Sequence, residues 1–270
     1  TLIANGDLNQ SVMIHSHDEF GELGETFNSM AANLEKAEKQ RQHMVADVAH
    51  ELRTPLAAIQ GTLEAMQDGV LPVNEEQLSA ISAETHLLNR LVGDLRLLSL
   101  AETSHLRLEK QETSLGELTT QLVERFKIQA DEKAIQVKAS IQPHLPSVKV
   151  DPDRITQVIT NLFANALRYT PINGEIALEV TQAATTNNQV VTITDTGPGI
   201  EVVNLPHVFD RFYRADKSRT RASGGSGLGL AIVKSLVEAH GGKVSVESPV
   251  FQNSGQTGYG TRFIITFNQD

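Results

Sequence analysis

The apolar positions divide the chain into a first part with helical spacing and a second part in which helical and alternating spacing take turns. From Phe27 to Leu52 the apolar residues recur at steps of three, four and seven, the spacing of a coiled-coil seam. This pattern predicts a helix that continues to Gln67, where the turn signal at 68–74 ends it. A second apolar stripe over 78–98 predicts a partner helix. Two helices cannot enclose a core of their own, so we expect two such hairpins to pair as a homodimeric four-helix bundle.

The residues after the hairpin predict an α/β sandwich. Residues 104–113 are polar and lose the helical period, and we expect them to form a hinge. Beyond the hinge, amphipathic stretches predict three helices near residues 114–130, 152–168 and 227–240. Runs of β-forming residues, most of them with alternating apolar positions, predict five strands near residues 135–140, 176–181, 190–194, 243–247 and 261–267. The expected architecture is one mixed sheet covered by helices on one face.

Composition narrows the classes of function. The formal net charge of -10 argues against a general nucleic-acid-binding protein, which needs a basic surface. The chain has no cysteine, which excludes disulfides and thiolate metal sites, and it has no apolar run of about 18 residues that would cross a membrane. It begins at Thr1 without a signal-like segment, so we expect a piece of a longer protein.

The first candidate for chemistry is His50, in the middle of the first predicted helix. At about 100° per residue, His50 lies on the side of the helix away from Val48 and its apolar stripe, so we expect its ring to face solvent. Glu51 could take a proton from that ring, and Thr54 lies one turn further along the same face. A lone exposed histidine is usually an ordinary solvated side chain. A functional role for His50 is favoured by the motif in which it lies, His-Glu-Leu-Arg-Thr-Pro-Leu.

A polar strip on the helix predicted at 152–168 has the chemistry of a phosphate site. Asn161, Asn165 and Arg168 fall within about 60° of one another around the helix axis, and Tyr169 ends the strip. Amide oxygens suit Mg²⁺ alongside phosphate oxygens, and the guanidinium of Arg168 can neutralise phosphate charge. Taken alone, the strip could also be a solvated polar face.

Two glycine-rich stretches have the features of nucleotide-binding turns. Asp195-Thr196-Gly197-Pro198-Gly199 follows a predicted strand; its aspartate can accept a hydrogen bond from the exocyclic amine of adenine, and its glycines let the backbone approach the base. Gly225-Ser226-Gly227-Leu228-Gly229 opens a predicted helix, so free amides and the helix dipole would face a phosphate. Alone, the first could be a tight turn. The second lacks the preceding strand and the spacing of a Rossmann fingerprint.

A cationic segment lies between the two glycine-rich stretches. It begins with Phe209-Asp210-Arg211-Phe212-Tyr213-Arg214 and continues with polar residues and three further cations to Gly224. Its charge and its shortage of apolar residues after Tyr213 predict a mobile lid over the phosphates. A disordered surface loop is compatible with the same pattern.

Together these motifs resemble those of the sensor histidine kinases of two-component systems. The string at 50–56 resembles their phosphoacceptor box. The strip at 161–169, the two glycine-rich stretches and the segment at 209–214 resemble, in order and spacing, the Asn box, the glycine boxes and the Phe box of the Bergerat ATP-binding fold. Residues 18–21 and 27–30 resemble the second half of a HAMP signal relay, although a capped helix start would look similar.

The resemblance implies an α+β multidomain protein in which a dimeric four-helix bundle precedes the α/β sandwich. Its expected parts are the end of a HAMP domain at 1–30, a signalling helix and phosphotransfer hairpin at 31–103, a hinge at 104–113 and an ATP-binding domain at 114–270. It implies ATP and Mg²⁺ as cofactors, and a second copy of the chain and the receiver domain of a response regulator as partners. The chain would be the cytoplasmic portion of an inner-membrane protein, attached to the membrane only through segments before Thr1.

The resemblance also implies roles for the motif residues. His50 is expected to be the phosphorylated nucleophile and Glu51 to polarise its ring, while Thr54 would orient water in a phosphatase activity on the regulator. Asn165 would hold Mg²⁺ with the assistance of Asn161. The residues expected to bind nucleotide are Asn161, Asn165, Arg168, Tyr169, Asp195, Gly197, Gly199, Arg214, Gly225, Gly227, Leu228 and Gly229.

Two other functions stay open on the sequence. The chain could be an ATPase of the same nucleotide fold, such as the chaperone, gyrase or mismatch-repair type, or a scaffold that binds no nucleotide. Those ATPases place a glutamate, the base for the hydrolytic water, four residues before the metal-binding asparagine, where this chain has Asn161. An amide cannot act as a base, which favours transfer of the phosphoryl group to a protein acceptor. The scaffold is disfavoured because no motif position is missing.

Overall fold

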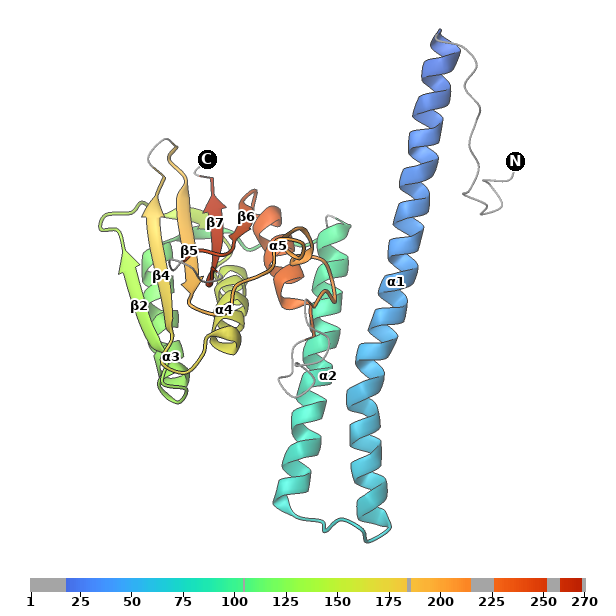
Figure 1. The fold of residues 1–270 in the computed structure, drawn as a ribbon, viewed down its shortest axis with the longest axis vertical. Coiled ribbons are helices and arrows are strands. Elements are labelled where there is room, and N and C mark those ends of the chain that lie inside the picture. Colours follow the sequence, from blue (N-terminus) through green and yellow to red (C-terminus); the bar gives the residue numbers. More distant parts are fainter. Residues whose placement is uncertain (1–17, 104, 184–185, 215–225, 252–257, 269–270) are drawn as a thin grey trace. The chain divides into compact units, whose positions relative to one another are not determined.

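The computed structural model describes residues 18–103, 105–183, 186–214, 226–251 and 258–268, which form two compact units. The first unit contains α1 (Glu19–Gln67) and the start of α2 (Glu75–Glu102) (Figure 1). The second begins at Asn89 and contains the rest of α2 and a mixed α/β domain. Residues 1–17, which make up more than half of the expected HAMP segment, lie outside the described residues.

The long helix α1 confirms the helix expected from the coiled-coil spacing. Its N-terminus is capped by Asp18, whose Oδ1 accepts hydrogen bonds from the amides of Phe20 (3.1 Å) and Gly21 (3.2 Å). The helix runs through Pro55 without interruption. The connection to α2 contains Gly69 at φ +70°, a left-handed conformation that favours glycine. Among the described residues, no helix combines the length and the apolar character that a bilayer-spanning helix needs.

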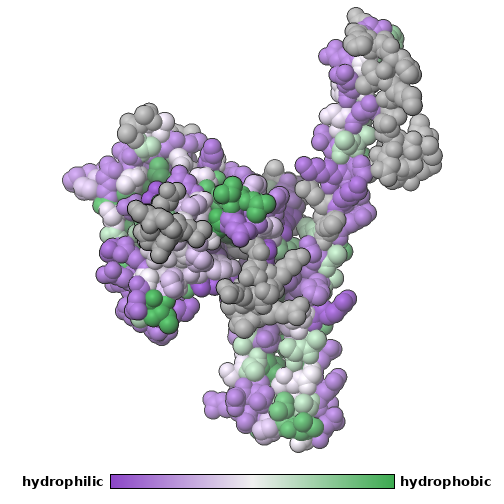
Figure 2. Space-filling view, viewed as in Figure 1, coloured by the Kyte–Doolittle hydropathy of each residue, from purple (hydrophilic) through white to green (hydrophobic). Residues whose placement is uncertain are grey.

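Within one chain, the apolar stripes of the hairpin stay partly uncovered. Leu56 and Leu63 of α1 are 48% and 43% exposed, and Leu78 of α2 is 55% exposed. Val70 and Val73 in the connection are exposed as well, and Figure 2 shows hydrophobic surface at this lower end of the hairpin. These side chains would gain free energy from burial against another surface.

The α/β domain of the second unit is built on one sheet. Its elements are β1 (Gln111–Thr113), α3 (Leu115–Asp131), β2 (Gln136–Ile141), β3 (Val148–Val150), α4 (Pro152–Tyr169), β4 (Glu175–Gln182), β5 (Gln189–Asp195), the 3-10 helix η2 (Leu205–His207), α5 (Gly229–Ala239), β6 (Lys243–Glu247) and β7 (Thr261–Phe267). Five strands form a mixed sheet in the order β2-β4-β5-β7-β6, in which only β2 and β4 are parallel neighbours. The helices α3, α4 and α5 cover one of its faces (Figure 1).

The core lies between the sheet and these helices. Residues along β7 alternate between buried and half-buried, so that one face of the strand packs inward. Ile155, Ile159 and Leu162 of α4 are fully buried. Phe163 of α4 stacks on Phe126 of α3 with the ring centroids 4.2 Å apart. Because each fully buried side chain of this size contributes about 1.5–3 kcal/mol, this packing fixes the rotation of α4 and therefore the position of its polar edge.

The α/β sandwich expected from the sequence is confirmed, with its three helices and five strands within about two residues of their expected positions. The sequence analysis predicts no strand in the expected hinge segment, yet residues 111–113 form β1 and pair antiparallel with β3 at 148–150. Each of these strands has three residues, too few to show an alternating pattern. The pairing joins segments far apart in the chain, and only the folded domain brings them together.

Candidate active site

His50 lies on the exposed surface of α1, as its position on the helix predicts. Glu51 beside it is half-buried, and the hydroxyl of Thr54 donates a hydrogen bond to the carbonyl oxygen of His50 at 3.3 Å. Such bonds back to the preceding turn are common for threonine in helices. These three residues share one stretch of helix in the first unit, whereas all the predicted nucleotide-binding residues belong to the second.

The helix α4 carries four of the predicted nucleotide-binding residues. It starts at Pro152, a residue suited to the first turn, and Asp151 caps it by accepting hydrogen bonds at Oδ1 from the amides of Asp153 and Arg154, both at 3.1 Å. The cap and the buried apolar face together fix the helix on the sheet. The predicted residues along its half-buried or exposed edge are Asn161, Asn165, Arg168 and Tyr169.

The side chain of Asn161 connects α4 with the glycine-rich start of α5. Its Nδ2 donates a hydrogen bond to the carbonyl oxygen of Gly229 at 3.4 Å. A Cβ atom on Gly229 would lie 3.8 Å from the Asn161 amide carbon, so the two chains are in van der Waals contact there. The amide of Asn161 therefore lies beside the N-terminus of α5, where the helix dipole favours an anion.

A backbone hydrogen bond joins the segment at 209–214 to the glycine-rich stretch at 225–229. The amide of Phe212 donates to the carbonyl oxygen of Gly227 at 3.0 Å, and both residues have positive φ, +56° and +72°. A Cβ atom on Gly227 would lie 2.8 Å from the Phe212 backbone, so only glycine fits. Arg214 is half-buried just beyond this junction, and Leu228 beside it is fully buried. The expected lid residues 215–224, and Gly225 of the glycine-rich stretch, lie outside the described residues.

Asp195 ends β5 in a buried position, 4% exposed. Its Oδ1 accepts a hydrogen bond from the amide of Gly197 at 2.8 Å. Burial raises the pKa of the Asp195 carboxyl from 3.8 to about 6, although the backbone amides of Gly197 and Thr261 act in the opposite direction. A partly desolvated carboxylate of this kind is a strong acceptor for a hydrogen bond from an amine.

The turn after Asp195 packs against the end of α4. A Cβ atom on Gly197 would lie 3.0 Å from the carbonyl oxygen of Tyr169, so the backbone of the turn approaches the helix closely. Gly199 follows with φ +80°. One helix thus contacts the glycine-rich start of α5 near Asn161 and the Asp195 turn at Tyr169, with Asn165 and Arg168 between. The structure brings the predicted nucleotide motifs of the second unit together along α4.

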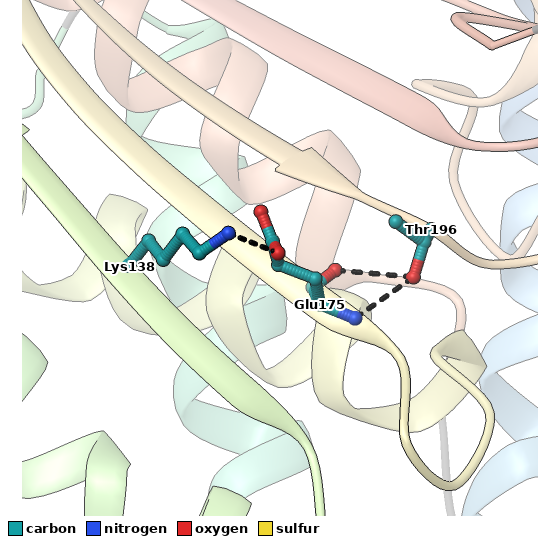
Figure 3. Close-up of polar contacts among 3 residues, drawn as sticks. All are labelled: Lys138, Glu175 and Thr196. Carbon is teal, nitrogen blue, oxygen red and sulfur yellow. Dashed lines mark hydrogen bonds and ion pairs between the residues drawn. The ribbon is translucent and has the colours of Figure 1, made fainter.

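The sequence analysis did not predict the side chains that fix the Asp195 turn, which are those of Thr196 and Ser248. The hydroxyl of Thr196 accepts a hydrogen bond from the amide of Glu175 at 2.8 Å and donates to the Glu175 carbonyl oxygen at 3.3 Å (Figure 3). The carboxylate of Glu175 pairs with Lys138 of β2 at 2.5 Å. The hydroxyl of Ser248 contacts the other end of the turn, where it accepts a hydrogen bond from the amide of Ile200 at 2.7 Å. Thr196 belongs to a predicted motif, although no role was predicted for its side chain. Ser248 belongs to no motif, because only the fold brings it to the turn.

The donor set on α4 suits Mg²⁺ bound together with phosphate. Asn161 uses its amide nitrogen toward Gly229, which leaves its Oδ1 as the atom that can serve a cation. Asn165 lies one turn further along the same half-buried edge. Neutral amide oxygens are ligands that Mg²⁺ accepts alongside phosphate oxygens and water. The residues present therefore fit the metal.

Three family models match the chain in succession. Residues 3–36 match the HAMP domain, and residues 40–104, which include His50, match the His Kinase A (phospho-acceptor) domain. Residues 150–270 match the histidine kinase-, DNA gyrase B-, and HSP90-like ATPase family, which supports ATP as the nucleotide of the α4 site. The matched ATPase segment contains every predicted nucleotide-binding residue.

Whole-chain comparisons give the same answer. The signal transduction histidine-protein kinase BaeS of Escherichia coli (strain K12) is 39% identical over 242 residues, which are 90% of this chain and 51% of that protein. The sensor histidine kinase YclK of Bacillus subtilis (strain 168) is 34% identical over 280 residues, 97% of this chain and 55% of that protein. The chain thus spans about half the length of these curated relatives.

Solved structures agree at the level of the fold. The Acinetobacter baumannii histidine kinase AdeS superposes with a TM-score of 0.66 at 27% identity, covering 82% of this chain and 98% of that one. The fold, the order of the matched domains and these relatives agree, and the chain belongs to the sensor histidine kinases of two-component systems.

Proposed function

We propose that the chain is the kinase core of a membrane-anchored sensor histidine kinase, which transfers the γ-phosphoryl group of ATP to His50 and then to an aspartate of a response regulator. The observation that carries the proposal is the amide of Asn161. By the spacing of the family motif, four residues before Asn165, it takes the position of the glutamate base of hydrolytic ATPases, and its Nδ2 donates to Gly229 at the start of α5. With no carboxylate at that position to activate water, the phosphoryl group is retained for a protein nucleophile. The exposed ring of His50 supplies one.

In the first step, a ring nitrogen of neutral His50 attacks the γ-phosphorus of ATP. The phosphorus–nitrogen bond forms as the bond to the β,γ-bridging oxygen breaks, ADP leaves, and the proton on the other ring nitrogen passes toward Glu51. Arg168 and Arg214 neutralise phosphate charge, and Asn165 and Asn161 hold Mg²⁺, which when bound neutralises charge on the phosphates. Positioning and charge neutralisation supply most of the rate acceleration in transfers of this kind.

The hairpin acts as a homodimer in this proposal. The large apolar side chains of Leu56, Leu63 and Leu78 are exposed in a single chain. A second hairpin would bury them in a four-helix bundle. The match of 40–104 to the phospho-acceptor domain family supports this assembly. We assign 31–103 to the signalling helix and hairpin and 114–270 to the ATP-binding domain.

The receiver domain of a response regulator is the proposed second partner. The histidine kinase ThkA, crystallised in complex with the response regulator protein TrrA, resembles this chain with a TM-score of 0.64 at 26% identity, over 88% of this chain and 66% of that one. Thr54 would orient a water molecule against the regulator's aspartyl phosphate and make the kinase bifunctional. The match of 3–36 to the HAMP family supports attachment to the cytoplasmic face of a membrane through segments before Thr1.

Labelling with γ-labelled ATP tests the proposal. We expect one acid-labile, alkali-stable label per chain, as a phosphohistidine gives, and its complete loss in His50→Gln. The matched control is His86→Gln, because His86 is also an exposed helical histidine but belongs to no motif. An acid-stable label, or labelling that survives in His50→Gln, would contradict the proposal.

A further inference from the structure

The turn at 195–200 is fixed on both sides by hydroxyl groups that no predicted site residue supplies. Resting on the proposed nucleotide function, we propose that Thr196 and Ser248 are positioning residues of the adenine site. Their hydroxyls hold the turn in the shape that keeps the Asp195 carboxylate ready to bind the base. Neither side chain needs to touch the nucleotide, since each acts through the backbone of the turn.

On one side, Thr196 ties the turn to the start of β4. Its backbone amide donates to the carbonyl oxygen of Glu175 at 3.1 Å, and its hydroxyl bonds to both the amide and the carbonyl oxygen of the same residue. Glu175 is itself held by Lys138 of β2 (Figure 3). A Cβ atom on Gly174 would lie 2.9 Å from the Thr196 hydroxyl, so the chain passes directly behind it. The residue after Asp195 is thereby anchored to two neighbouring strands.

On the other side, Ser248 ties the turn to the segment that enters β7. Its hydroxyl accepts a hydrogen bond from the amide of Ile200 at 2.7 Å and donates to the carbonyl oxygen of Gly260 at 2.9 Å. A Cβ atom on Gly199 would lie 3.1 Å from the Ser248 oxygen, closer than an ordinary contact. The hydroxyl thus bridges two backbone segments, the turn at Ile200 and the chain at Gly260.

A chain of hydrogen bonds leads from Ser248 to the carboxylate. The amide of Gly260, whose carbonyl oxygen accepts from Ser248, donates to the carbonyl oxygen of Gly197 at 2.8 Å. The amide of Gly197 in turn donates to Oδ1 of Asp195 at 2.8 Å. Loss of the hydroxyl leaves the Ile200 amide and the Gly260 carbonyl oxygen without this partner. The turn can then change its shape, and the carboxylate of Asp195 can move away from the position suited to binding the base.

This arrangement predicts a loss in recognition of the base that exceeds the loss in binding of the phosphates. In the proposed site the phosphates would lie near Asn161 and Gly229, about two turns before the C-terminal end of α4, and the Asp195 turn would contact the base. Adenosine diphosphate has the exocyclic amine whose N–H would donate a hydrogen bond to Asp195. Inosine diphosphate has a carbonyl oxygen at the same ring position, which cannot donate. The ratio of the two affinities therefore reports the geometry of the turn, and a general loss of folding would lower both affinities together.

The experiment measures binding of ADP and inosine diphosphate to the whole chain by calorimetry with Mg²⁺ present. We expect the parent to prefer ADP, and Thr196→Val and Ser248→Ala to bind ADP about tenfold more weakly but inosine diphosphate within about twofold of the parent. Thr196→Ser, which keeps the hydroxyl, should restore the preference. Ser245→Ala is the matched control, because Ser245 is a half-buried serine three residues earlier on β6.

The outcomes separate this inference from the function on which it rests. A parent that binds neither nucleotide contradicts the proposed function itself. A parent that prefers ADP while Thr196→Val and Ser248→Ala keep the same ratio overturns the inference and leaves the kinase assignment intact. Equal loss of both nucleotides also overturns it, since it indicates a purely structural role. Where Ser248→Ala does not fold, the comparison of Thr196→Val with Thr196→Ser decides.

Discussion

Replacing Asp195 by asparagine should change stability and nucleotide affinity in opposite directions. Burial raises the pKa of the Asp195 carboxyl to about 6, so folding favours its protonated form. A carboxyl of this kind stabilises the fold fully below its unfolded pKa of 3.8, and the contribution is lost as the pH rises through about 6. At pH 7.5 the ionised carboxylate therefore destabilises the empty protein.

The size of the effect follows from the shift in pKa. A rise from 3.8 to about 6 corresponds to about 3 kcal/mol at about 1.4 kcal/mol per unit. Asparagine has nearly the same shape, and its Oδ1 can still accept the hydrogen bond from Gly197. We therefore expect Asp195→Asn to raise the free energy of unfolding at pH 7.5 by about 1 to 3 kcal/mol. The gain should disappear near pH 4, where the parent carboxyl is protonated.

The same charge should matter for binding. The carboxylate accepts a hydrogen bond from the exocyclic amine of adenine, and this charge-assisted bond is lost in asparagine. We expect Asp195→Asn to bind ADP at least about tenfold more weakly at pH 7.5. The affinity of the parent should fall about tenfold between pH 7 and pH 5 as Asp195 is protonated. Asp195→Asn is the reference for that titration, because the phosphates of ADP titrate in the same range.

Two measurements check this prediction. Urea unfolding at pH 7.5 and pH 4 gives the stability difference, and calorimetry across pH 5 to 7.5 gives the affinities. A variant that is less stable than the parent at pH 7.5 and binds ADP equally well would refute both the raised pKa and the role of Asp195 in binding the base.

Three further predictions test other parts of the account. Leu63→Asp should convert a dimer to monomer, because it places a charge in the expected bundle core, and light scattering that shows an unchanged dimer would contradict the bundle. Thr54→Ala should keep autophosphorylation within a few-fold but slow dephosphorylation of the regulator by roughly 10², and parallel loss of both rates would argue for a structural role. Gly227→Ala should weaken ADP binding about tenfold, because its Cβ would meet the Phe212 backbone at 2.8 Å. Gly241→Ala is its control, with a similar φ of +79° but nothing within 4 Å, and equal effects of the two substitutions on binding would rule out the contact as the cause.

The helices that the sequence predicts are stabilised by local interactions that the structure shows. Asp18 caps α1, and Asp151 with Pro152 starts α4, where side chain and backbone lie a few residues apart. The periodicity of the apolar residues was sufficient to predict the buried face of α4, and the same helical geometry predicted the polar edge beside it.

The features that the sequence could not predict depend on contacts between distant segments. β1 and β3 are too short to have a pattern, and they exist because they pair with each other. Ser248 reaches Ile200 across 48 positions, and Asn161 reaches Gly229 across 68. The motifs showed which residues could hold a nucleotide, but only the packing of α4 on the sheet determines what supports them.

The most direct test of the central claim follows the γ-phosphoryl group through one turnover. The chain is mixed with less than one equivalent of γ-labelled ATP, and ADP, labelled protein and free labelled phosphate are measured together over time. The account predicts that labelled protein and ADP appear mole for mole, with little free phosphate, because Asn161 provides no base for water. Release of labelled phosphate in step with ADP, without labelled His50 at any time, would show a hydrolytic ATPase and contradict the account.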